Sequence, residues 1–257
     1  MITHNGKQVT LAMRNRKAIN LIARNGKAMW EAMYGIDAAA KAVILAEYGK
    51  QVWSDVKQYA KAHPAIVPFI NQDPHLAASI STNSNKERWL VGDGMAWIQT
   101  SIVTTITTSA HMRFKTGTIS GALMGGNNWS TNSWLTQFSS NTIRWHWASG
   151  VLNPPIAANT IYDAIFAANY IKLNDVERTG SGASKVGEKV QLFACTTTRC
   201  NAHIARVQFK DGEEIVGDYV PYPLPDGTYG MLDMVTCQLF ANANTQGQFT
   251  IAITDKE

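Results

Sequence analysis

Acidic side chains that lie close together are the first residues whose types and spacing could do chemistry. Retaining glycoside hydrolysis needs two carboxylates about 5–5.5 Å apart, and residues two positions apart share one face of a strand. Asp175 and Glu177 have that spacing, but they stand near Gly180 in a polar segment. The other closely spaced acids flank a predicted turn, where carboxylates are usually solvated: Asp211, Glu213 and Glu214.

Two cysteines near a histidine form the other candidate for catalysis. Cys195 or Cys200 could act as a nucleophile with His203 as the base, but no orienting third group is evident, and hairpin packing explains these residues better. The sequence has no Gly-x-Ser-x-Gly segment and no phosphate-binding loop. We therefore predict that the protein is not an enzyme, with no catalytic residue and no metal site.

Tryptophans beside polar side chains indicate a different chemistry, because sugars stack their C–H faces on aromatic rings while amides bond the hydroxyls. Trp145 and Trp147 share one face of a predicted strand and alternate with Arg144 and His146. A polar loop precedes them. The candidate carbohydrate-binding residues are Asn127, Asn128, Trp129, Trp134, Trp145 and Trp147. The alternative, which the sequence leaves open, is that the Trp rings fill a core.

The composition of the 257 residues restricts the class of protein. Only 16% are charged, against about 25% in a typical soluble domain, while 45% are hydrophobic. These values exclude a disordered chain, a coiled coil and a collagen-like chain. No apolar run reaches the length of a membrane span, and the first residues lack a signal-peptide core, so we expect synthesis in the cytosol. Three cysteines make no disulfide framework.

A ten-residue repeat opens the sequence. Asn5, Asn15 and Asn25 are each followed two positions later by a lysine, and Asn-Gly at two of these positions favours a two-residue hairpin. Hairpins this small need something to dock on. Residues 1–35 have one acid and six basic side chains: Lys7, Arg14, Arg16, Lys17, Arg24 and Lys27. Such a segment could meet nucleic acid or an acidic partner, but solvated turn residues explain the charges better, and nucleic acid is not the partner we predict.

One amphipathic helix is predicted from Asp37 to Ala62. Asp37 is a suitable N-cap, Gly49 softens the middle and His63-Pro64 ends the helix. Its apolar stripe consists of Leu45, Tyr48, Val52, Val56 and Tyr59. The stripe must be buried on the hairpins, on the next domain or on copies of the chain. Three prolines and a small polar stretch then predict a linker over residues 64–88.

From Trp89 onward the pattern is β. Short runs of alternating apolar and polar residues are separated by Gly, Asn, Pro and Asp, which predicts a sandwich or jelly roll. The predicted strands include residues 95–103, 111–115, 142–147, 164–173, 189–194, 203–210 and 214–220. The predicted divisions are hairpins over 1–35, a helix over 36–63, a linker over 64–88 and a sandwich over 89–257.

A series of short segments in this β region resembles a known family. The segments are residues 97–100, 122–126, 191–194, 205–212, 218–221, 225–233, 239–242 and 246–249. The most specific stretch starts at Asp218-Tyr219-Val220-Pro221 and continues through Asp226-Gly227 to Phe249. Over about residues 89–254 the series is similar to the concanavalin A-like (laminin-G-like) jelly-roll domain of phage and prophage virion proteins.

The resemblance implies a mainly β protein, with a C-terminal concanavalin A-like jelly roll preceded by short β-hairpins and one amphipathic helix. It implies a virion structural protein, such as a head fibre, a capsid accessory or a tail-associated appendage. Residues 1–63, with the six basic side chains, would attach to other virion proteins, a trimer is expected, and the lectin-like domain would hold a host glycan. Ca²⁺ is common in this superfamily, and Asp93 and Asp233 are isolated candidates; otherwise no cofactor is predicted. The alternatives are a lectin-like protein outside a virion and a glycoside hydrolase.

Overall fold

The structure is a computed structural model, and it describes residues 35–118, 120–126, 134–147, 150–182 and 186–256, with four two-residue strands before them. These strands are β1 (Thr3–His4), β2 (Lys7–Gln8), β3 (Met13–Arg14) and β4 (Lys17–Ala18). β1 pairs with β2 and β3 with β4, both antiparallel with two residues between the paired strands. The first two predicted hairpins are therefore confirmed. The third turn and the six basic side chains lie outside the described residues.

The predicted helix forms as two helices, α2 (Ala38–Glu47) and α3 (Gly49–Ala62). Asp37 caps α2 as predicted, because its side-chain Oδ1 accepts a hydrogen bond from the Ala40 amide at 2.7 Å. The helix is interrupted at Tyr48, and the following Gly49 has a φ of +85°, in the left-handed region that glycine adopts without strain. The prediction that His63-Pro64 ends the second helix is confirmed.

The predicted linker over residues 64–88 is wrong, since most of it is helical and packed. It contains η1 (Pro64–Ile66), α4 (Val67–Gln72), η2 (Pro74–Leu76) and α5 (Ala77–Ile80), followed by strand β5 (Lys86–Gly92). The prolines occupy the first turns of the short helices, where a fixed φ is favourable and a missing N–H costs nothing. Ile66, Ile70 and Leu76 are fully buried.

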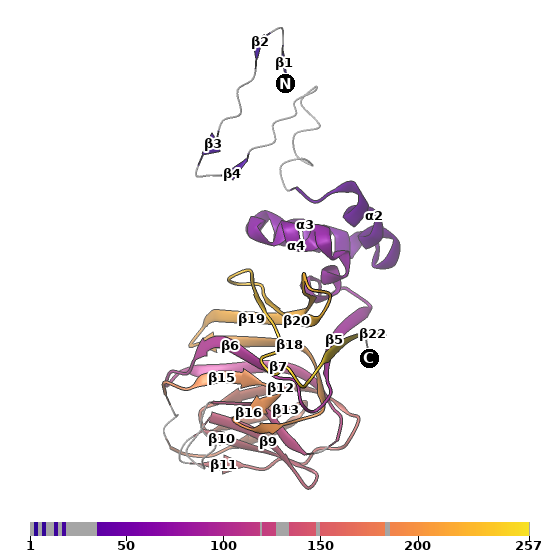
Figure 1. The fold of residues 1–257 in the computed structure, drawn as a ribbon. Helices are drawn as coiled ribbons and strands as arrows, with labels where there is room; N and C mark the ends of the chain where they lie inside the picture. Colours follow the sequence, from indigo (N-terminus) through magenta and orange to yellow (C-terminus); the bar gives the residue numbers. More distant parts are fainter. Residues whose placement is uncertain are drawn as a thin grey trace.

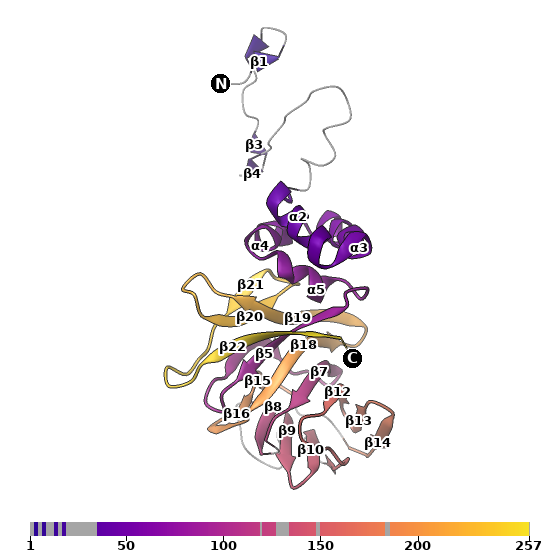
Figure 2. The ribbon, with the colours of Figure 1, turned by 90° about the vertical axis from the view of Figure 1, so that its right-hand side faces the viewer.

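These helices lie on one sheet of the β region, over strands β19 (Glu214–Pro223) and β20 (Tyr229–Asp233), as Figures 1 and 2 show. The buried faces of α2, α3 and the short helices form one apolar cluster with Val220, Tyr222 and Leu232. The Tyr222 hydroxyl also donates to the Phe69 carbonyl at 2.9 Å. The apolar stripe of the helix could pack on the hairpins, on the next domain or on copies of the chain. Among the described residues, it packs on the next domain.

Two large antiparallel sheets and one small two-stranded sheet make up the described part of the β region. Of the two large sheets, the smaller runs β11 (Val151–Leu152), β10 (Thr142–Trp147), β9 (Trp134–Ser139), β8 (Gly121–Gly125), β15 (Lys189–Leu192) and β6 (Ile98–Val103). The larger runs β14 (Val176–Thr179), β13 (Tyr170–Leu173), β12 (Ile161–Ala167), β7 (Thr108–Thr116), β18 (Ala202–Asp211), β19, β20 and β21 (Gln238–Phe240). β5 also pairs with β18 and with β22 (Phe249–Asp255), and β16 (Ala194–Cys195) pairs with β17 (Thr198–Arg199).

Side chains from both sheets meet in one apolar core, so the fold is mainly β, as predicted. β7 alternates strictly, with Met112 and Phe114 buried in the core and His111 and Arg113 on the opposite face. One predicted strand, residues 164–173, is instead the hairpin of β12 and β13, with Asn169 at a φ of +52° in its turn. Within the described ranges, no helix is long and apolar enough to cross a membrane.

Candidate functional site

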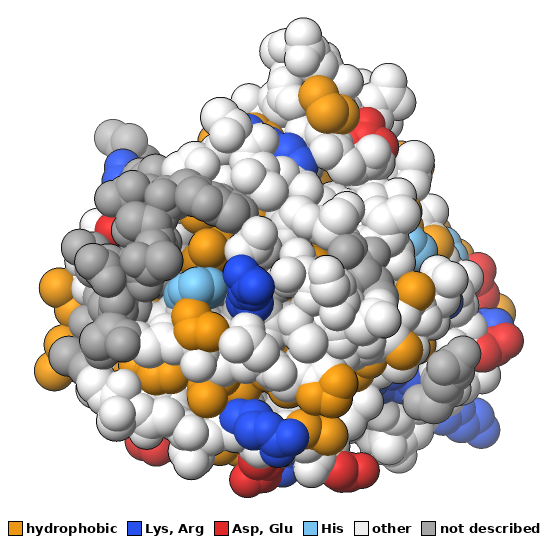
Figure 3. Space-filling view, turned by 90° about the horizontal axis from the view of Figure 1, so that it is seen from below, with side chains coloured by type: hydrophobic (Ala, Val, Ile, Leu, Met, Phe, Trp, Pro, Cys, Tyr) orange, Lys and Arg blue, Asp and Glu red, His pale blue; other side chains and the backbone are white. Residues whose placement is uncertain are grey.

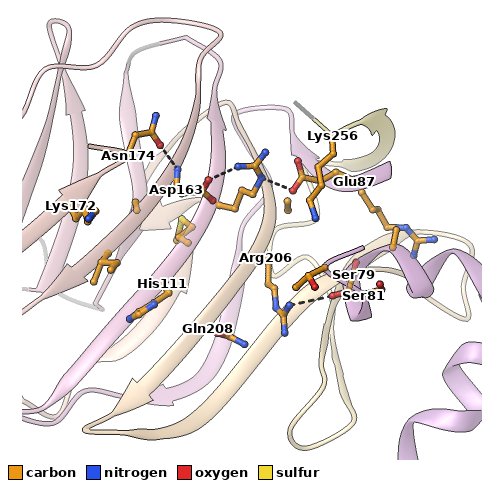
Figure 4. A pocket seen from close by; sticks show the side chains of 18 residues that line it. Ser79, Ser81, Glu87, His111, Asp163, Lys172, Asn174, Arg206, Gln208 and Lys256 are labelled. Carbon is orange, nitrogen blue, oxygen red and sulfur yellow. Dashed lines mark hydrogen bonds and ion pairs between the residues drawn. The ribbon is translucent and has the colours of Figure 1, made fainter. Parts of the chain in front are cut away.

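A pocket of about 410 Å³ opens on the face of the large sheet that points away from the core. Its floor is formed by the outward-facing side chains of β7, β12 and β18, and one wall is formed by α5 and the residues after it (Figure 4). Register explains the floor, because Arg113 on β7 lies directly opposite Asp163 on β12 and Arg206 on β18. The pairing of β18 with β7 shifts register between Ile204 and Arg206, at this point of the floor.

Arg113 joins two carboxylates at the floor of the pocket. Its Nε donates to Glu87 Oε1 and its Nη1 to Asp163 Oδ2, each at 2.6 Å. The side chain of Glu87 is only 9% exposed and that of Asp163 is 66% exposed, so the group extends from the interior to solvent. Burial alone would lower the pKa of Arg113, but the two carboxylates outweigh it and raise the pKa. The guanidinium is therefore charged and held in one place.

A second arginine is held in the same way beside the first. Arg206 makes a bidentate pair with Asp218, from Nε to Oδ1 at 2.8 Å and from Nη2 to Oδ2 at 2.6 Å. Gln208 donates to the same carboxylate at 3.2 Å. Like charges opposite each other on neighbouring strands repel, and here each arginine has its own carboxylate partner. Bidentate pairing fixes the planar guanidinium, which suits recognition of a polar ligand.

The rim of the pocket is also polar. Lys172 pairs with Glu177 at 2.7 Å, and Asn174 accepts a hydrogen bond from the Asp163 amide at 2.8 Å. Burial, with a smaller effect from Lys210, lowers the pKa of His111, so its ring is neutral at pH 7. Lys256 lines the rim near the C-terminus (Figure 4). The charges of the pocket are thus mostly paired rather than of one sign.

The wall formed by the helical segment is tied to the sandwich by specific bonds. Arg206 Nη1 donates to the Ser79 carbonyl at 3.3 Å. Arg88 and Asp73 form a buried ion pair that includes an Nη2–Oδ1 bond of 2.8 Å. On the other side of the wall, Ser81 Oγ donates to Asp55 Oδ2 at 2.5 Å. The pocket is therefore shared between the sandwich and the segment that precedes it.

The structure corrects the role expected for the later tryptophans. Trp134, Trp145 and Trp147 are fully or almost fully buried in the sandwich core. The rings of Trp134 and Trp145 pack edge to face at 4.9 Å, and Trp145 Nε1 donates to the Ala167 carbonyl at 2.8 Å. A ring in the core cannot stack on a sugar from solvent, so the core alternative is the correct one for these three residues. Asn127, Asn128 and Trp129 lie outside the described residues.

The acidic candidates for catalysis are bonded to neighbouring side chains, and the thiol candidates are buried. Glu177 is paired with Lys172, and Asp211 accepts hydrogen bonds from the hydroxyls of Thr105, at 2.7 Å, and Thr107. Burial raises the pKa of Cys195 to about 12 and raises that of the fully buried Cys200 as well. Both thiols are therefore protonated at neutral pH and are poor nucleophiles.

The two candidate Ca²⁺ ligands, Asp93 and Asp233, accept hydrogen bonds from backbone amides. Asp93 accepts hydrogen bonds from the amides of Met95, Ala96 and Gln248, at 2.7–2.9 Å. Asp233 is fully buried and accepts from the amides of Asp218 and Val235. Among the described residues, no group of three His, Cys, Asp or Glu side chains could hold a metal ion.

The end of the sandwich that lies away from the helices presents a mixed surface. Apolar, basic and acidic side chains are interspersed there, and a histidine lies beside a basic side chain (Figure 3). This mixture specifies no single ligand chemistry, and the pocket is the stronger candidate.

The chain has no match in two comparisons, one with protein families and one with curated proteins. The function must therefore be inferred from the residues and their geometry.

The sequence analysis missed the residues that form the floor of the pocket, Glu87, Arg113, Asp163 and Arg206. One local signal was present, since the outward positions of β7 and β18 are polar or charged in a regular alternation. That signal marks a polar face. It does not show which strands lie side by side, and the site depends on that arrangement.

Proposed function

We propose that this protein is a structural protein of a bacteriophage virion, such as a head fibre, a capsid accessory or a tail-associated appendage, and that its lectin-like sandwich binds a glycan of the host surface. The glycan would occupy the pocket between α5 and the outer face of the large sheet. The observation that carries this proposal is the pocket itself, whose floor presents two immobilised arginines and their carboxylates.

The chemistry of these groups suits a polyhydroxylated ligand. Adjacent sugar hydroxyls each donate and accept hydrogen bonds, and carboxylates, guanidinium groups and amides are their strongest partners. The apolar part of the lining is aliphatic and includes Ile165 and Ala205. Because the described lining has no Phe, Tyr or Trp ring, affinity for a single sugar would rest on hydrogen bonds. Useful adhesion would then come from several copies acting together.

The N-terminal part supplies the proposed attachment to the particle. The hairpins of residues 3–18 are too small to fold stably by themselves, and docking on other virion proteins would stabilise them. The helices that follow are already packed on the sandwich, so attachment would fall to residues 1–34 rather than to the whole of residues 1–63. A trimer, as in a fibre, remains part of the proposal.

Binding of the full-length protein to an array of bacterial-surface and mucin glycans tests the proposal. Asp163→Asn removes an exposed carboxylate of the pocket. Asp175→Asn, in an exposed turn that does not line the pocket, is the matched control. We expect binding by the wild type and the control, and weaker binding by Asp163→Asn. No binding to any glycan would contradict the lectin role.

Two further assays separate the alternatives. Cofractionation of the protein with intact particles supports the virion role, whereas glycan binding without cofractionation favours a free lectin-like protein. Release of reducing sugar from a bound polysaccharide would favour a glycoside hydrolase.

A further inference from the structure

We propose that the protein has a second saccharide-binding site, formed by Trp97 and Arg199, and that this site takes a sugar that has a carboxylate group. The inference rests on the proposed glycan-binding function, and it adds a further site together with the charge class of its ligand. Trp97 directly precedes β6, and Arg199 is the last residue of β17. Neither residue lines the pocket.

The first observation is an arginine that is stacked on an indole ring and has no carboxylate partner. The guanidinium of the half-buried Arg199 lies over the Trp97 ring, 5.1 Å from its centroid. Its Nη1 donates to the carbonyls of Thr196 and, at 3.3 Å, Thr198, and no carboxylate of the described residues pairs with it. Three other arginines of the β region do have such a partner: Arg88, Arg113 and Arg206.

The second observation is that two donors of this pair are unused and can be reached from solvent. Arg199 Nη2 and the indole Nε1 of Trp97 make no hydrogen bond within the described ranges. Arg199 Nε is buried without a partner, whereas Nη2 and the indole nitrogen keep access to solvent. One of the two accessible donors is charged, and a carboxylate is the strongest partner for a guanidinium donor.

The pair is held in place before a ligand arrives. The Trp97 amide donates to Asn242 Oδ1 at 3.1 Å. Gln191 Oε1 accepts from the Thr196 amide at 3.0 Å and so fixes the turn whose carbonyl holds Arg199. Positioning the binding groups in advance lowers the entropic cost of binding.

The neighbouring side chains favour a saccharide over an acidic segment of another protein. Gln99 lies two residues after Trp97 and is paired with Gln191 on β15, and Thr196 and Thr198 flank Arg199 in the hairpin of β16 and β17. These are neutral amides and hydroxyls, which both donate to and accept from sugar hydroxyls. The core of a protein–protein interface is more apolar than this.

The test compares one sugar ring with and without its carboxylate, using the full-length wild-type protein. Galacturonate with galactose, and glucuronate with glucose, are titrated at low salt and followed by saturation-transfer NMR. A short glutamate peptide supplies carboxylates without a sugar. We expect the acid of at least one pair to bind more tightly than its neutral partner and than the peptide, with an advantage that falls as salt is added. Acids that bind no better than their neutral partners, or a peptide that binds more tightly, would overturn the inference.

Variants locate the site. Arg199→Gln removes the charge, and we expect it to weaken binding of the acidic sugar about tenfold. Arg199→Lys keeps the charge but loses the planar set of donors, so its binding should be intermediate. Arg178→Gln is the matched control, because it removes the same charge from an exposed arginine of β14, and it should leave binding unchanged. Circular dichroism checks that each variant is folded.

The outcomes distinguish this inference from the function beneath it. Weaker binding of the acidic sugar by Arg199→Gln, with unchanged binding of neutral glycans, would support a second site. Binding of the acidic sugar that survives Arg199→Gln and is lost in Asp163→Asn would overturn the second site and leave the lectin function standing. Absence of binding by the wild type to every sugar and glycan would overturn both.

Discussion

Replacement of Asp73 by alanine should destabilise the protein strongly, because it leaves a charge buried without a partner. The side chains of Arg88 and Asp73 are 3% and 7% exposed, and they join β5 of the sandwich to the turn between α4 and η2. Arg88 has one further bond, at 3.3 Å, to the Pro221 carbonyl. Removal of one partner of a buried ion pair costs about 3–5 kcal/mol, since the remaining ion stays desolvated.

An exposed ion pair on the same strand gives the matched control. Lys86 and Asp255 are in contact at 2.5 Å, but their side chains are 37% and 80% exposed. Solvent screens such a pair, and we expect Asp255→Ala to cost less than about 1 kcal/mol. Urea denaturation, followed by tryptophan fluorescence and circular dichroism, measures both differences in unfolding free energy.

The reasoning also predicts a rescue. The double variant Asp73→Leu with Arg88→Met replaces the buried charges by apolar side chains of similar size, and it should recover most of the lost stability. A cost below about 1 kcal/mol for Asp73→Ala, equal to that of the exposed control, would refute the claim that this pair is buried and holds the helices to the sandwich.

Three other predictions follow from the packing. Gly150→Ala should lower stability by about 1–3 kcal/mol in thermal denaturation, because its Cβ would lie 2.2 Å from the Trp147 ring; an unchanged midpoint would contradict this. Hydrogen bonds from Asn83 and Ser81 lower the pKa of Asp55 in the folded protein. The stabilisation from the Asp55 carboxylate is therefore present above the unfolded pKa of about 3.9 and is lost as pH falls through the lower folded pKa. The unfolding free energy of Asp55→Asn should differ from that of the wild type at pH 7 and converge with it below the folded pKa. A fragment that starts at residue 86 should bind a hydrophobic dye and lose the pocket, since it exposes the face that the helices cover; a monodisperse fragment with unchanged glycan binding would contradict this.

Local patterns predicted the parts of the fold that depend on neighbours in sequence. The cap at Asp37, the end at His63-Pro64 and the alternation of β7 and β18 follow from periods of 3.6 and 2 residues, and each was found. The same patterns failed where one signal has two meanings. Proline interrupts a helix and also begins one. The prolines therefore predict a linker over residues 64–88, whereas residues 64–80 form short helices.

The site could not be predicted because its residues come together only through strand pairing. Glu87, Arg113 and Asp163 belong to three strands far apart in the sequence, and the register of β7 with β12 places Arg113 opposite Asp163. The tryptophans gave a misleading signal for a related reason. Alternation showed that Trp145 and Trp147 share a face, but only the second sheet determines that this face is the core.

The most direct test of the central claim is to locate the ligand on the full-length protein by methyl NMR. Ile165 and Ala205 line the pocket, while Val103 and Ile106 are exposed elsewhere. During titration with a neutral saccharide that binds, we predict shifts of the pocket methyl groups and none for the distant ones. Shifts confined to methyl groups outside the pocket would contradict the account.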